Sequence, residues 1–181
     1  MDPYSFSKLL RDLVPEMQGD ATSLLETCRA KGFPMVVATT LRGPGLQARL
    51  WCQSRNETEI HIAASMLSRA GAPFAASFLK FDSRYRGRHC TNALPGESWH
   101  ALGEAMDCYL AGPNRTIISD ASHPGYKVYA AEAVKLGLNA GALWRAFADP
   151  CHVQLRVAAS PLKAGLKWPE IDTLLIQRGG A

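Results

Sequence analysis

The 181-residue chain lacks several features that would assign a protein to a class at once. Its first residues, MDPYSFSKLLRDLVPEM, contain no basic segment followed by an unbroken apolar run, so we expect no signal peptide. The longest apolar-rich stretch, residues 60–79, contains His61 and Arg69, so no stable membrane insertion is expected. No run of Lys and Arg with interleaved aromatic residues stands out, which argues against a nucleic-acid partner.

The cysteines also exclude two common arrangements. The chain has five of them, an odd number, and no C-x-x-C pair. Neither a disulfide framework nor a cysteine zinc knuckle is therefore indicated. We expect reduced and mostly buried thiols in a protein that folds in a cytoplasm.

What is present favours one compact domain, residues 1–181, of the α+β class. The hydrophobic fraction of 47% and charged fraction of 20% are ordinary for a globular protein, and the net charge is +4. Apolar spacing predicts helices over residues 5–31 in two pieces, 46–54, 61–79 with a break near 71–73, 127–136 and from 169 onward. Strands are predicted at 35–40, 105–110 and 151–157, and a long loop at 86–99. Because helices and strands do not alternate regularly, we expect a small antiparallel sheet flanked by helices.

Three residues can be placed on predicted strands or beside them so that they face a metal. His100 and Asp107 lie seven residues apart across Gly103. In the strand at 105–110, Asp107 lies on the face opposite Met106, Cys108 and Leu110, which we expect in the core. His152 lies on the polar face of the strand at 151–157, together with Gln154 and Arg156.

Two histidines and a carboxylate are the protein ligands of many catalytic zinc sites, where water takes the fourth position. Asp149, three residues before His152, is then the nearest carboxylate to take a proton from that water. From spacing alone the alternative stays open, because a histidine is more often a structural or surface residue than a metal ligand.

Longer sequence motifs in the chain resemble those of a known family. S-x-H-x-x-G-x-A-x-D at residues 98–107, followed by D-x-x-H at 149–152, resembles the zinc D-alanyl-D-alanine carboxypeptidases. That family includes the L-alanyl-D-glutamate endopeptidases that serve as phage endolysins. The resemblance extends over about residues 20–156. It includes T-N-A-L-P-G-E at 91–97, W-x-x-F-x-D at 144–149, and Arg42 with Gln47 five residues on, while residues 56–85 are less familiar.

The resemblance implies a role for each of these residues. The fold would be that of the Hedgehog domain and the D-Ala-D-Ala peptidases, with zinc held by the residues His100, Asp107 and His152. Asp149 would be the catalytic base and acid, and Arg42 would act beside the scissile bond. Substrate would be bound by Arg42, Gln47 and Ser98, with Ser98 and Gln154 also able to orient the ligands.

The function that the resemblance implies is hydrolysis of the L-alanyl-D-glutamate bond of peptidoglycan stem peptides by zinc-activated water. Aspartate at position 149 looks more like the endolysins, since some relatives have glutamate there. We therefore expect a monomeric phage endolysin that stays in the host bacterial cytoplasm until it is released to the wall. A D-alanyl-D-alanine carboxypeptidase is the close alternative, and a non-catalytic zinc module, as in Hedgehog, is a more distant one.

Overall fold

A computed structural model describes residues 2–179 of the chain. Contacts between residues divide it into two compact units. Unit 1 consists of Met1–Phe6, Arg42–Leu102 and Ala158–Ala181, and unit 2 consists of Ser7–Leu41 and Gly103–Val157.

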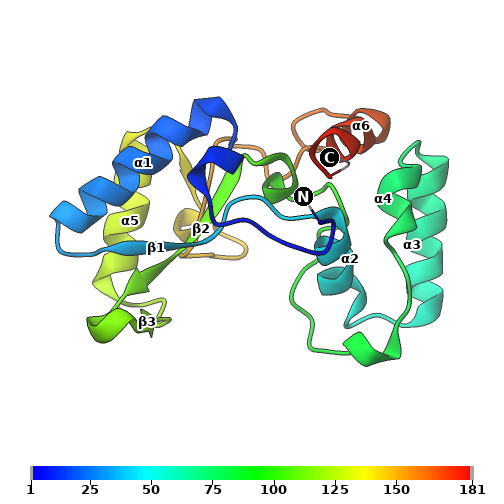
Figure 1. Cartoon of the computed structure of the whole chain (residues 1–181), viewed down its shortest axis with the longest axis horizontal. Coiled ribbons are helices and arrows are strands. Elements are labelled where there is room, and N and C mark those ends of the chain that lie inside the picture. The colour runs from blue at the N-terminus through cyan, green and yellow to red at the C-terminus, as the bar shows by residue number, and fades with distance from the viewer. Residues whose placement is uncertain (1, 180–181) are drawn as a thin grey trace. The chain divides into compact units, whose positions relative to one another are not determined.

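Unit 2 contains the sheet and two long helices (Figure 1). Its helices are α1 (Pro15–Ala30) and α5 (Pro124–Lys135), with short 3-10 turns η1 (Leu10–Asp12), η4 (Pro113–Arg115) and η5 (Gly141–Leu143). Its strands are β1 (Met35–Thr39), β2 (Ala105–Ala111), β3 (Ile117–Ile118), β4 (Asn139–Ala140) and β5 (His152–Gln154). The sheet has the order β1-β2-β5-β4, β3 pairs with β2, and all pairs are antiparallel. The predicted α+β class with a small antiparallel sheet is confirmed.

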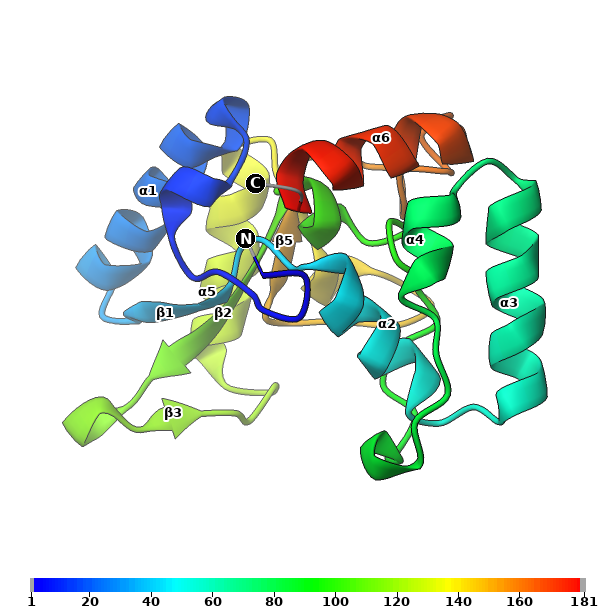
Figure 2. The ribbon, with the colours of Figure 1, turned by 45° about the vertical axis from the view of Figure 1, so that its right-hand side comes forward.

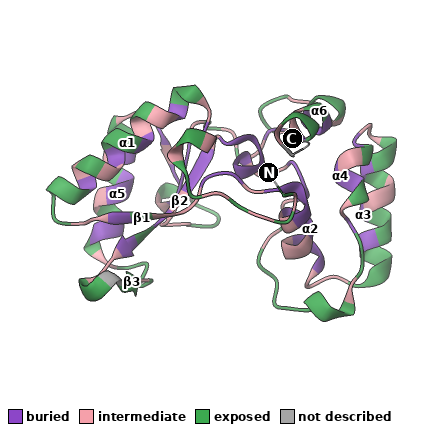
Figure 3. Ribbon diagram, viewed as in Figure 1, coloured by how far each residue is buried: buried purple, intermediate pink, exposed green. Residues whose placement is uncertain are grey.

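One face of this sheet forms the core of unit 2. In α1, Met17, Ala21, Leu24 and Cys28 recur at helical spacing and are all fully buried. They pack in one cluster with Tyr126, Tyr129, Ala130 and Ala133 of α5 and with Met106, Cys108 and Leu110 of β2. Figure 3 colours the buried residues of α1, α5 and β2 purple. The predicted inward face of β2 is therefore confirmed.

The register of the strands decides what the opposite face carries. Asp107 lies directly across from His152, and Ala105 lies across from Gln154. Since side chains alternate along a strand, these four residues share the face that points away from α1 and α5.

Unit 1 is helical. Its elements are α2 (Pro44–Cys52), α3 (Glu57–Arg69), α4 (Pro73–Ser77), α6 (Trp168–Gly179) and the 3-10 turns η2 (Ser83–Tyr85) and η3 (Trp99–Leu102). Asn56 and Glu59 form a capping box that starts α3. The carboxylate of Asp172 in α6 accepts the backbone N–H groups of Phe74 and Ala75, which fixes α4 against α6. Figure 2 shows α3 and α4 side by side. The chain between them, residues 70–72, is the break that was predicted near residues 71–73.

Two predicted elements are wrong in extent. Within residues 5–14 the only helical turn is η1, because Ser7 exchanges backbone hydrogen bonds with Thr40 and Leu41 in an extended conformation. The strand predicted at 151–157 is only His152–Gln154. Beyond it, the carbonyl groups of Arg156 and Val157 accept side-chain amides instead of a strand partner, and Val157 is 87% exposed instead of facing the core.

The 86–98 segment and the cysteines can be described together. Residues 86–98 form a loop without helix or strand, and all five cysteines are free thiols, three of them buried. Burial raises the pKa of the Cys108 thiol to about 12, so it stays protonated and inert. Among residues 2–179 no helix is long and apolar enough to cross a membrane.

Candidate metal centre

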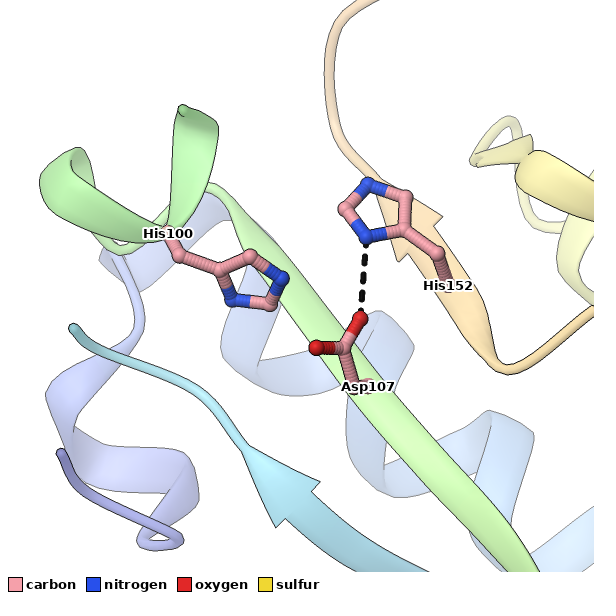
Figure 4. Close-up of side chains that lie close together, drawn as sticks. All are labelled: His100, Asp107 and His152. Carbon is pink, nitrogen blue, oxygen red and sulfur yellow. Dashed lines mark hydrogen bonds and ion pairs between the residues drawn. The ribbon is translucent and has the colours of Figure 1, made fainter. Parts of the chain in front are cut away.

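The three residues predicted to bind metal come together in the structure. His100, Asp107 and His152 each present one ligand atom, and these atoms lie within 4.8 Å of one another (Figure 4). His100 comes from η3, Asp107 from β2 and His152 from β5. Both histidines are buried, with 2% and 8% of their surface exposed, and Asp107 is partly buried. This is the only group of three such side chains among the described residues that is arranged to share a metal.

Asp107 and His152 already interact across the two strands. Nδ1 of His152 lies 2.9 Å from Oδ1 of Asp107. Burial by itself lowers the pKa of His152, but the hydrogen bond and negative charge of Asp107 outweigh it, so the pKa is raised above its ordinary value.

Gln154 determines which nitrogen of His152 carries the proton when the ring is neutral. The amide nitrogen of Gln154 donates to the carbonyl of Arg156, so its oxygen is turned to Nε2 of His152, 3.1 Å away. An amide oxygen only accepts, and Nε2 therefore carries a hydrogen. In a neutral ring, Nδ1 is then the nitrogen with the free lone pair, which is the form that a metal needs.

Trp144 and Asn139 hold the same ring from its other side. The rings of Trp144 and His152 lie 5.1 Å apart between centroids and are tilted by 52°. The indole N–H of Trp144 donates to Oδ1 of Asn139 at 3.1 Å. His152 is thus fixed by contacts at Nδ1, at Nε2 and on its face.

The donor set fits zinc. Two imidazoles and one carboxylate are a common catalytic zinc set, and donor atoms this close can share an ion whose bonds are about 2 Å long after small side-chain movements. Both ring nitrogens of His152 lie within hydrogen-bond distance of oxygen atoms, Nδ1 of Oδ1 of Asp107 and Nε2 of Oε1 of Gln154. Zinc held by His100, Asp107 and His152 would balance the negative charge of the Asp107 carboxylate.

Asp149 lies in the turn that leads into β5. Its backbone carbonyl accepts the N–H of His152 at 3.1 Å, and Oδ1 accepts the thiol of Cys151 at 3.2 Å. Its negative charge makes a small contribution to the raised pKa of His152, after the larger effect of Asp107. Asp149 is outside the group of metal-binding atoms, as its predicted role as a base requires.

Gly141 leaves room for this turn. Its carbonyl accepts the N–H of Asp149 at 3.0 Å. A Cβ at position 141 would lie 2.5 Å from the carbonyl oxygen of Asp149 and 3.2 Å from the Cβ atoms of Asp149 and His152. No residue with a side chain fits here unless the turn moves.

We therefore expect Gly141→Ala to displace Asp149 and His152. The clash is with backbone, so unfolding free energy should fall by about 1–3 kcal/mol, with weaker zinc binding. Chemical denaturation and a zinc competition titration measure the two effects. Gly19→Ala is the matched control: nothing lies within 4 Å of a Cβ there, in the middle of α1, so it should be neutral or stabilising. Equal behaviour of the two variants would show that Gly141 does not position the site.

Arg42 and Gln47 form a separate hydrogen-bonded unit in unit 1. Nη1 of Arg42 donates to Oε1 of Gln47 at 3.0 Å, and Nε2 of Gln47 donates to the carbonyl of Ala93 at 2.8 Å. The backbone N–H of Arg42 donates to the carbonyl of His100 at 3.0 Å. Gln47 is 1% exposed, and its side-chain amide connects the guanidinium of Arg42 to the carbonyl of Ala93 in the 86–98 loop. These hydrogen bonds orient the guanidinium.

Ser98 lies at the start of η3, two residues before His100. It is half-buried, and its backbone carbonyl accepts the N–H of Ala101 at 3.0 Å. The neighbouring Trp99 is buried and donates its indole N–H to the carbonyl of Ala158 at 2.7 Å. These contacts give η3, and with it His100, a fixed position in unit 1.

Residues 11–138 match the family model described as VanY, D-alanyl-D-alanine carboxypeptidase. The chain belongs to this family. The matched range of the VanY family includes Arg42, His100 and Asp107 and ends before Asp149 and His152, whose positions rest on the geometry described above. No curated protein matches the chain in sequence.

Two solved structures are similar to the chain. The first, the LdcB LD-carboxypeptidase, whose structure bears on peptidoglycan recognition, is 16% identical, with a TM-score of 0.45 over 93% of this chain and 72% of that chain. The second is the vancomycin resistance D,D-pentapeptidase VanY in complex with Zn(II). It is 17% identical, with a TM-score of 0.47 over 92% of this chain and 88% of that chain. Both likenesses are weak, so neither structure assigns a role to a residue here.

Sequence reasoning missed Gly141, Asn139 and the contact of the Trp144 ring with His152. None of them carries a chemical group that indicates catalysis. The available signal was that Trp144 and Asp149 belong to one motif, which suggested a connected approach to His152.

Proposed function

We propose that the chain is a zinc-dependent peptidase that hydrolyses a bond in the stem peptides of peptidoglycan. The observation that carries this proposal is the convergence of His100, Asp107 and His152 in a member of the VanY family. Zinc bound there would lower the pKa of its water to about 7 and polarise the scissile carbonyl.

The residues of the chain supply the remaining functions. Asp149, close to His152 and not itself a ligand, would accept the proton of the attacking water and deliver it to the leaving amine. Arg42, whose guanidinium is oriented by its hydrogen bond to Gln47, would bind the scissile carbonyl or a substrate carboxylate. An aspartate in this position also argues against a non-catalytic zinc module.

For the bond that is cut, we propose the L-alanyl-D-glutamate bond, as in phage endolysins. The support is the aspartate at position 149, which resembles the endolysins, and this proposal includes a monomer that is held in the host cytoplasm until release. The second candidate is removal of the terminal D-alanine. It is favoured by the description of the matching family as D-alanyl-D-alanine carboxypeptidases.

Product analysis of digested peptidoglycan distinguishes the two bonds. Cleavage of the proposed bond exposes the amino group of D-glutamate, which amine labelling followed by mass spectrometry detects. Free D-alanine as the main product, with no newly exposed glutamate amine, assigns the carboxypeptidase reaction instead. A chelator should stop either reaction, and hydrolysis that continues at full rate after complete metal removal would contradict zinc catalysis.

We expect Arg42→Lys to lower kcat/KM although the charge is kept. A lysine cannot contact Gln47 and substrate at once with a planar fork, and loss of one such electrostatic contact costs on the order of a hundredfold. Steady-state hydrolysis of a purified wall peptide measures it, with Arg69→Lys, on the exposed end of α3, as the matched control. Full kcat/KM in Arg42→Lys would remove Arg42 from the mechanism.

A further inference from the structure

The excess positive charge of the chain belongs to unit 1. This unit contains 11 Lys and Arg against 7 Asp and Glu, whereas unit 2 contains 9 of each. Much of the charge lies in the segment that follows α4, Lys80–His89, with the sequence KFDSRYRGRH, which we call the basic loop. Its basic residues are exposed, and its one acid is Asp82. This is a basic run with interleaved aromatic residues, a feature that the sequence was expected to lack.

The backbone of the basic loop is held against the end of α2. The N–H of Gly87 donates to the carbonyl of Gln53 at 2.9 Å, and the side-chain amide of Gln53 donates to the carbonyl of Arg88 at 2.8 Å. Nη1 of Arg86 donates to the carbonyl of Arg55 at 2.6 Å. The cations are therefore presented from a fixed loop, which reduces the entropy that binding would cost.

Aromatic rings contact guanidinium groups of the basic loop and of the neighbouring helix α2. The guanidinium carbon of Arg49 lies 4.2 Å from the ring centre of Tyr4 and 4.4 Å from that of Tyr85, and Arg86 lies 5.9 Å from Phe81. Arginine stacked on a ring keeps the N–H groups at its edge available for carboxylates. Since these rings already contact the chain's own cations, they are poor platforms for stacking nucleic-acid bases.

Not every cation of the loop is equally available. Arg84 donates from Nε and Nη2 to both oxygens of Asp82, so its fork is already occupied by a carboxylate. Lys80, Arg86 and Arg88 are exposed, and none of them forms an ion pair with an acidic side chain within residues 2–179. The Arg84–Asp82 pair shows the kind of bidentate contact that this loop can make.

We propose that the basic loop binds carboxylates of peptidoglycan stem peptides away from the bond that is hydrolysed, and so retains the enzyme on the polymer. This inference rests on the proposed function, because it takes the substrate to be a polymer of peptides that contain D-glutamate. The loop adds affinity for the insoluble wall and leaves the reaction at the metal centre unchanged.

The test compares wild type with the triple variant Lys80→Gln, Arg86→Gln, Arg88→Gln. Sedimentation with insoluble peptidoglycan stripped of other polymers, on ice before measurable digestion, gives the bound fraction. At low salt we expect about tenfold weaker binding by the variant, and the difference should disappear at high salt. Conversion of the wall carboxylates to amides should weaken wild-type binding to the level of the variant.

Matched controls separate the loop from net charge and from catalysis. The triple variant Arg11→Gln, Arg29→Gln, Lys127→Gln removes the same charge from exposed positions of unit 2 and should bind like wild type. Hydrolysis of a short soluble wall peptide should be equal in all three proteins. If that hydrolysis is absent even in wild type, the proposed function fails, whatever the binding result.

Three results would overturn the inference about the loop. One is equal loss of binding in the control variant, since net charge would then suffice. Another is wild-type binding that survives amidation of the wall carboxylates. The third is tighter, salt-sensitive binding of a single-stranded oligonucleotide than of peptidoglycan, which would assign the loop to nucleic acid.

Discussion

The His100→Ala variant is expected to lose its zinc and, with it, measurable hydrolysis of wall peptides. His100 supplies one of three donor atoms that lie within 4.8 Å of one another, and two donors hold zinc poorly in competition with water. Loss of a direct ligand should cost more than the 10–100-fold in affinity that is typical when a residue behind a ligand is changed. Metal analysis after dialysis against a weak chelator, with wild type beside it, measures the loss.

The matched control is His61→Ala. His61 lies exposed on α3 and belongs to no group of metal-binding side chains in the described chain, so its loss should leave zinc content unchanged. Because His100 is 2% exposed, circular dichroism must show that the variant is folded. A folded His100→Ala protein that keeps one tightly bound zinc would contradict the site.

The Asp149→Ala variant is expected to keep its zinc and lose most of its turnover. Asp149 lies beside His152, but its oxygens are not among the clustered donor atoms. Removal of a group that transfers protons in the transition state lowers kcat by roughly a hundredfold to ten-thousandfold. The zinc dissociation constant should change little, because no ligand is removed.

Two further variants make this prediction specific. Asp149→Asn keeps the size and the thiol contact but cannot accept the proton, so it should be as inactive as alanine. Asp149→Glu keeps a carboxylate and should recover part of the activity. Near wild-type kcat in Asp149→Asn would rule out Asp149 as the base, and lost zinc in all three variants would instead assign it to holding the turn before β5.

Most of the fold of each unit follows from local sequence patterns. The apolar spacing of Leu24, Leu25 and Cys28 predicted α1, and the alternation along residues 105–110 predicted which side chains of β2 face the core. The strand at 151–157 was predicted too long, because alternation alone does not show where pairing stops. Only the side-chain amides of Asn139 and Gln154, which bind the carbonyls after β5, show that end.

The sequence by itself predicted the residues of the candidate metal centre, because the pattern at residues 98–107 and the late D-x-x-H together resemble one specific family motif. It also determined the side of β2 on which Asp107 lies, since side chains on a strand alternate. The tertiary structure alone decided the pairing of Asp107 with His152, 45 residues apart, because the register between two strands depends on packing across the whole sheet. It likewise decided that Gln154 directs the proton of His152 to Nε2 and that Gly141 makes room for Asp149. Such contacts depend on distances of a few ångströms between segments that no local pattern connects.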